Sequence, residues 1–126
     1  MADSTNITDP KLSILTSVKR LLGIAEDYEH FDTEIILNIN SVLTVLNQLG
    51  LGPKDGFGIE DKTAAWDSFI GERKDLQAII TYVSLKVRLM FDPPQSGFLV
   101  ESINKLCQEF EWRLNVQAET PESGEG

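Results

Sequence analysis

The chain has 126 residues, a formal net charge of −9 at pH 7, 41% hydrophobic residues and 25% charged residues. This length suits one domain with its own core, and the acidic balance argues against a ligand such as the nucleic-acid backbone, which requires clustered lysine and arginine. A single cysteine, Cys107, excludes an internal disulfide, and no apolar run approaches the roughly eighteen residues of a membrane span. We therefore expect a single domain made in a reducing cytoplasm and not bound to a membrane.

The first predicted helix covers residues 10–22. Asp9 can cap it, and the proline that follows suits the first helical position, where a missing amide hydrogen costs little. Lys19 and Arg20 fall in the last turn, where basic side chains interact favourably with the helix dipole, and Gly23 is placed to end the helix. Its apolar positions recur every three or four residues, at Leu12, Leu15, Val18, Leu21 and Leu22.

A second helix is predicted for residues 32–49, whose apolar residues trace one continuous face until Gly50. Asn38, Asn40 and Asn47 lie inside this helix, although asparagine is a mediocre helix former. The simplest interpretation places these three side chains in solvent. The alternative is that they make polar contacts.

Residues 50–61 are rich in glycine and are predicted to form a surface loop, with a brief extended piece at 57–59 as one option. A short helix around Trp66 follows, with the indole turned inward. Residues 56–63 have the length of a Walker phosphate-binding loop, but Asp61 stands where that pattern needs a glycine before the lysine. Its charge would face the phosphates, so a flexible loop is the favoured interpretation.

The third predicted helix, residues 75–91, is nearly apolar on every side. A helix without a polar face must be covered from more than one direction. One explanation is that a second subunit covers part of it, and the interface candidates are then Tyr82, Leu85 and Leu89. The other explanation is that it is the central helix of a monomeric bundle.

Asp92, Pro93 and Pro94 are predicted to form a rigid corner after this helix. Proline lacks the amide hydrogen that a helix interior needs, and its ring pushes the preceding residue out of the helical region. Ser96 can then cap a fourth helix, residues 96–114, through its hydroxyl.

The fourth helix is expected to turn one apolar stripe inward, made of Leu99, Ile103, Leu106, Phe110 and Leu114. Cys107 lies at the edge of this stripe and is predicted to be a core cysteine. Residues 117–126 are acidic, lack apolar periodicity and are predicted to be a disordered tail. The sequence therefore predicts one all-α domain over residues 1–116, a small bundle of four main helices plus a short one. Its expected core includes Ile39, Leu46, Ile80, Val83, Val87, Ile103 and Phe110.

The sequence contains no convergent set of reactive groups, since it has only one histidine and one cysteine. His30 and Glu34 have a one-turn helical spacing that could hold a metal ion. The simpler interpretation is that these are ordinary acidic residues before and within the first turn of the second helix, favoured by its dipole, namely Asp27, Glu29, Asp32 and Glu34. We expect no enzymatic activity, no metal and no cofactor.

The order and spacing of several segments resemble the small helical head-tail connector, or adaptor, proteins of tailed bacteriophages. The resemblance covers about residues 15–116, and no single piece is chemically diagnostic. It is carried by SVKRLLGI at 17–24, by residues 31–36, 39–42, 46–53 and 59–63, by Trp66 and Tyr82, by KVRLMFDPP at 86–94, and by EWRLN at 111–115.

The resemblance implies a structural virion protein at the head-tail junction. It implies a homo-oligomeric ring of about a dozen copies, bound beneath the portal protein and offering its other face to head-closure or tail-completion proteins. A dozen copies at −9 would carry about −108 charges, a field that repels DNA, so DNA would pass through the channel without specific binding. The alternative is a small monomeric or dimeric helical interaction or regulatory module.

Trp112, Arg113, Leu114 and Asn115 end the fourth helix and are the expected portal-docking residues. Tryptophan and arginine are the residue types most enriched at binding hot spots. We expect the proline corner to hold this end of the helix at the required angle. The alternative is that Trp112 closes the core of the bundle itself.

Overall fold

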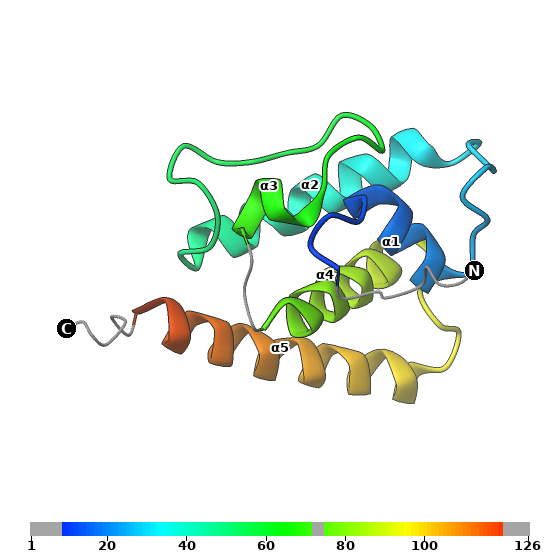
Figure 1. The fold of residues 1–126 in the computed structure, drawn as a ribbon. Helices are drawn as coiled ribbons and strands as arrows, with labels where there is room; N and C mark the ends of the chain where they lie inside the picture. The colour runs from blue at the N-terminus through cyan, green and yellow to red at the C-terminus, as the bar shows by residue number, and fades with distance from the viewer. Residues whose placement is uncertain (1–8, 72–74, 120–126) are drawn as a thin grey trace.

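The computed structural model describes residues 9–71 and 75–119, with side chains as far as Val116. Within these residues no strand forms, and a single isolated bridge pairs Ser13 with Ala65, so no extended ladder exists at 57–59. The prediction of a small all-α bundle is confirmed. Its helices are α1 (Ile14–Leu22), α2 (Asp32–Gln48), α3 (Trp66–Ile70), α4 (Leu76–Phe91) and α5 (Gly97–Glu119) (Figure 1).

Helix α4 lies at the centre of the bundle. Helices α1 and α2 pack against it on one side, and α5 packs against it on another (Figure 1). Seven of its sixteen residues are buried, including Tyr82 and Ser84, which lie on opposite flanks of the helix. Five of the seven expected core residues are buried, at Ile39, Leu46, Ile80, Val83 and Val87, while Ile103 and Phe110 are partly buried against that core.

Helix α1 begins four residues later than predicted. Ser13, in extended conformation, is its N-cap and accepts a hydrogen bond from the Thr16 amide at 3.1 Å. Asp9 instead closes a tight turn, accepting from the Lys11 amide at 2.9 Å. The prediction of an Asp9 cap was wrong, because the chain before α1 pairs with residues 64–67 instead of continuing the helix. The pairing consists of backbone hydrogen bonds between Ile14 and Ala64, Leu12 and Trp66, and Pro10 and Asp67. Gly23 ends α1 as predicted, in the left-handed conformation at φ 83°.

The short helix α3 turns Trp66 inward, as predicted. The indole is fully buried and its Nε1 donates to the Ser17 hydroxyl at 3.1 Å. This bond satisfies the only polar atom of the ring and ties α3 to α1.

Asn40 and Asn47 do not point freely into solvent, so the favoured interpretation of these residues was wrong. Asn40 both donates to the Ile59 carbonyl at 3.0 Å and accepts from the Ile59 amide at 2.7 Å, while Asn47 donates to the carbonyls of Leu51 and Pro53. Each amide side chain therefore replaces a backbone partner that the irregular loop at 49–65 lacks.

The proline corner forms where predicted: α4 ends at Phe91, α5 begins at Gly97, and the Ser96 hydroxyl accepts from the Leu99 amide at 3.3 Å. Helix α5 extends to Glu119, five residues beyond its predicted end. It thus includes residues 117–119 of the expected tail, while residues 120–126 lie outside the described part of the chain.

The inward face of α5 differs from the predicted stripe. Leu114 and Cys107 are buried and Val100 is half-buried, whereas Leu99 and Leu106 are exposed. In this orientation Glu111 faces α4, where its carboxylate accepts a hydrogen bond from the Tyr82 hydroxyl. Periodicity alone does not reveal this polar contact.

The connection between α1 and α2 is held by the ammonium of Lys19, which is only 2% exposed. Its Nζ donates to the carbonyls of Glu26 at 3.0 Å and Tyr28 at 2.8 Å, and pairs with the Asp32 carboxylate at 2.7 Å. Burying an ammonium is costly unless such partners replace its hydration. Lys19 is therefore a structural clamp.

We expect Lys19→Met to lower the free energy of unfolding by about 2–3 kcal/mol, because it leaves Asp32 unpaired and two carbonyls without a donor. Urea unfolding followed by circular dichroism measures this loss. Arg20→Met is the matched control, since Arg20 forms an exposed ion pair with Glu26 and should cost less than about 1 kcal/mol. Equal effects of the two substitutions would contradict the clamp.

Candidate assembly surfaces

Cys107 and His30, the residue types most often found in reactive centres, do not form a catalytic arrangement. Burial raises the pKa of the Cys107 thiol, so the thiol stays protonated at neutral pH, and its side chain is enclosed in the core. His30 is exposed and contacts the ring of Phe31 edge-on, with 4.7 Å between ring centroids. Across residues 9–71 and 75–119, no three His, Cys, Asp or Glu side chains gather as metal ligands would.

The glycine-rich loop is organised by its own polar contacts. The Asp61 carboxylate accepts bonds from both the hydroxyl and the amide of Thr63, and these bonds lower the pKa of Asp61. A Cβ at Gly58 would lie 3.3 Å from the Asn40 amide oxygen, so the loop backbone packs closely against α2. This arrangement presents a carboxylate where a phosphate-binding loop presents amides.

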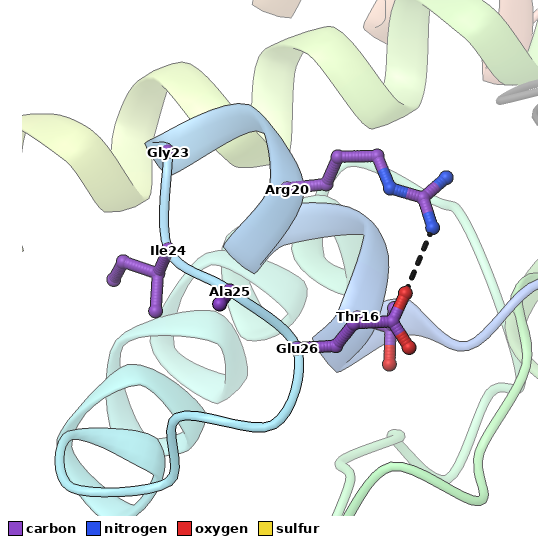
Figure 2. A pocket seen from close by; sticks show the side chains of 6 residues that line it. All are labelled: Thr16, Arg20, Gly23, Ile24, Ala25 and Glu26. Carbon is purple, nitrogen blue, oxygen red and sulfur yellow. Dashed lines mark hydrogen bonds and ion pairs between the residues drawn. The ribbon is translucent and has the colours of Figure 1, made fainter.

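A hollow lies between α1 and the segment that follows it, lined by Thr16, Arg20, Gly23, Ile24, Ala25 and Glu26. Figure 2 shows that Arg20 and Glu26 face each other across it, and their ion pair measures 3.1 Å. Because the two charges satisfy each other, this hollow does not present a charged group to a small ligand.

The outer side of α5 carries more exposed large hydrophobic side chains than any other described helix. Of the ten large hydrophobic residues exposed in the described part of the chain, five lie on α5, namely Phe98, Leu99, Leu106, Trp112 and Val116. The helix packs chiefly against α4 and covers it with one face only. Its remaining faces carry apolar groups that the fold of one subunit does not use.

The four expected portal-docking residues do not share one face of α5. The Trp112 side chain is 68% exposed, so it does not close the core of the bundle. Arg113 is exposed and lies 3.8 Å from Glu109, whereas Leu114 is buried and Asn115 is half-buried. Trp112 and Arg113 are thus available to a partner, and Leu114 anchors the helix that carries them.

Glu111 stabilises the contact between α4 and α5. The Tyr82 hydroxyl donates to its carboxylate at 2.6 Å, and the Lys86 ammonium lies 3.7 Å from the same oxygen. Tyr82 is fully buried under α5, which removes it from the surface that a second subunit could reach. The other two interface candidates, Leu85 and Leu89, are half-buried.

Comparison with known proteins decides what class of molecule carries these surfaces. The sequence model described as "Phage connector protein" matches residues 14–121. The chain belongs to the phage connector protein family. No curated protein matches the sequence, and no solved structure matches it either.

As a phage connector, the protein is a structural component of a bacteriophage virion and interacts with other proteins of the phage head or tail. Proteins of this family are generally not enzymes. No described helix of this connector is long and apolar enough to cross a membrane.

The sequence did not reveal two polar residues that organise the connector, Lys19 and Glu111. A signal for Lys19 exists, because position 19 lies on the same helical face as Leu15, Val18 and Leu22. A charged residue on an apolar face indicates a buried partner. No comparable local signal marks Glu111, whose partners lie on another helix.

Burial, and then the bond to Glu111, raise the pKa of Tyr82 far above its usual value of 10.0. The unfolded chain releases this proton near pH 10 while the folded chain keeps it, so folding stability should be intact below about pH 10 and fall as the pH rises further. Tyr82→Phe should cost about 1–2 kcal/mol at neutral pH, by removing a bond to a carboxylate. It should also reduce the alkaline loss of stability.

Urea unfolding of parent and variant between about pH 8 and pH 11 tests this prediction. Tyr28→Phe is the control, because Tyr28 is half exposed. An unchanged alkaline slope in Tyr82→Phe would show that the Tyr82 proton does not support folding.

Proposed function

We propose that this connector forms a ring at the head-tail junction of a tailed phage, where it docks beneath the portal and joins it to closure or tail proteins around the DNA channel. The observation that carries the proposal is the outer surface of α5, with Trp112 exposed and Arg113 beside it. These side chains contribute nothing to the core of their own subunit. They therefore suit contact with a larger assembly.

A ring of identical subunits needs two different, complementary flanks on each subunit. Helices α2 and α5 lie on opposite sides of α4 (Figure 1). One flank would be formed by α4 and α5, with the half-buried Leu85 and Leu89 and the exposed Leu106 as apolar contact residues. The other flank would be α2 with the loop at residues 50–61. Contacts between these flanks would close a ring of about a dozen copies when the portal acts as template.

The charge of the protein supports the same role. Each copy carries −9, so a ring would surround the channel with negative charge and repel the DNA backbone. DNA would then slide past without specific binding.

Purified connector should assemble into a ring on one face of the portal, visible by negative-stain microscopy. Light scattering should report a mass increase of several connector copies per portal complex. Without the portal as template, the connector is expected to have the mass of a monomer or a small oligomer in dilute solution. A monomer or dimer that leaves the portal unchanged would instead favour an isolated interaction module.

Trp112→Ala should weaken portal attachment about 30-fold, which corresponds to a hot-spot loss of about 2 kcal/mol. The free energy of unfolding should change by less than about 0.5 kcal/mol, because the side chain is mostly exposed. Phe98→Ala is the matched control, since Phe98 is also mostly exposed, at 77% against 68% for Trp112, at the other end of the same helix. Portal binding by surface plasmon resonance checks both variants, and an equal loss from Phe98→Ala would contradict a local docking site at Trp112.

A further inference from the structure

Four aromatic rings meet where the α1–α2 connection touches the end of α4. Phe31 contacts each of the others, with centroid distances of 5.9 Å to Tyr28, 4.7 Å to His30 and 5.3 Å to Phe91. We name Tyr28, His30, Phe31 and Phe91 the aromatic corner. Three of its members come from one connection and the fourth from the end of a helix, so the tertiary fold assembles it.

Most of the aromatic corner faces solvent. Tyr28 is 50% exposed and Phe31 is 37% exposed, His30 is exposed as well, and Phe91 alone packs in part against the core. Met90, at 45% exposure, precedes Phe91 at the end of α4. A contiguous exposed apolar surface of this kind is typical of a protein interaction site.

The backbone beneath the aromatic corner is held in place. The Lys19 ammonium binds the Tyr28 carbonyl at 2.8 Å and the Glu26 carbonyl at 3.0 Å, and the Tyr28 and Asp32 amides donate to carbonyls within the same connection. Few backbone conformations are therefore left to lose when a partner binds. A preorganised aromatic surface binds with a lower entropic cost than a flexible one.

The surroundings of the aromatic corner are acidic. Asp27 and Glu29 are exposed on the connection that carries three of the rings, Glu34 is exposed in the first turn of α2, and the exposed Asp92 follows Phe91. Of the basic residues nearby, Lys19 pairs with Asp32 and Arg20 pairs with Glu26, while the exposed Lys62 lines a hollow together with Asp27 and Glu29, so that acidic groups outnumber free basic ones. The surface thus combines an apolar centre with an acidic rim, which complements an apolar side chain flanked by lysine or arginine.

The position of the aromatic corner separates it from the portal-docking surface proposed above. The α1–α2 and α4–α5 connections lie at one end of the molecule, and the C-terminal end of α5 lies at the opposite end (Figure 1). A protein that connects two others needs two such separate surfaces.

We propose that the aromatic corner docks a second protein of the head-tail junction, through a segment with an apolar anchor and flanking basic residues. This inference rests on the proposed function, which supplies the junction in which the second protein is found. Another copy of this chain is a poorer occupant, because the ring contacts proposed above already use α2, the loop at residues 50–61 and the edge of α4 and α5.

The test places the photo-crosslinker benzoylphenylalanine at position 28 or at position 112 in connectors assembled into phage particles. The probe at position 28 should yield an adduct with a junction protein other than the portal, and the adduct should map by mass spectrometry to a basic segment. The probe at position 112 should label the portal. Adducts from position 28 with the portal or with another connector copy, or no adduct while position 112 labels the portal, would overturn the proposal.

Two substitutions test the chemistry of the surface. Tyr28→Ala and Glu29→Lys should each lower the yield of tailed particles at least tenfold without changing portal attachment. Trp112→Ala is the matched control, because it should weaken portal attachment itself, which the two substitutions in the aromatic corner should leave unchanged. Normal tail joining in both Tyr28→Ala and Glu29→Lys would overturn the docking role, whereas absence of the connector from particles would overturn the proposed function itself.

Discussion

The burial of α4 is the constraint on which the rest of the structure depends. Its sequence offers no polar face, so α1, α2 and α5 must cover it from different directions. Helix α5 supplies the last cover with one face only, because no further helix packs outside it in the described chain. The exposed apolar side chains of α5 are therefore a consequence of how a small bundle encloses an apolar central helix.

Two charged residues fix the geometry of the surfaces that this bundle presents. Lys19 holds the α1–α2 connection through two carbonyls and Asp32, and Glu111 holds α5 against α4 through Tyr82 and Lys86. Buried or partly buried charges of this kind add little net stability, since desolvation offsets their attraction. They do select one orientation, because any other arrangement leaves a charge without partners. Lys19 thus sets the position of the aromatic corner, and Glu111 sets the position of the outer surface of α5.

The sequence predicted the helices and their ends well where the cause is local. The proline corner and the Ser96 cap act through neighbouring atoms, and the left-handed Gly23 needs only the absence of a Cβ. Predictions failed where a distant segment competes for the same groups. Asp9 does not cap α1 because the preceding chain pairs with residues 64–67, and Asn40 leaves solvent because Ile59 supplies a backbone amide and carbonyl.

The sequence by itself determined that the chain is helical, that α4 must be enclosed and that α5 restarts after a rigid corner, because periodicity and backbone sterics act within a few residues. Only the tertiary structure decided which face of α5 turns inward, placing Leu99 and Leu106 outside and Glu111 against α4. It alone also brought Phe31 of the α1–α2 connection into contact with Phe91 at the end of α4. The physical reason is that the orientation of a helix and its tertiary contacts depend on which groups from distant parts of the chain pair with each other. Such pairs produce no periodic pattern in the sequence.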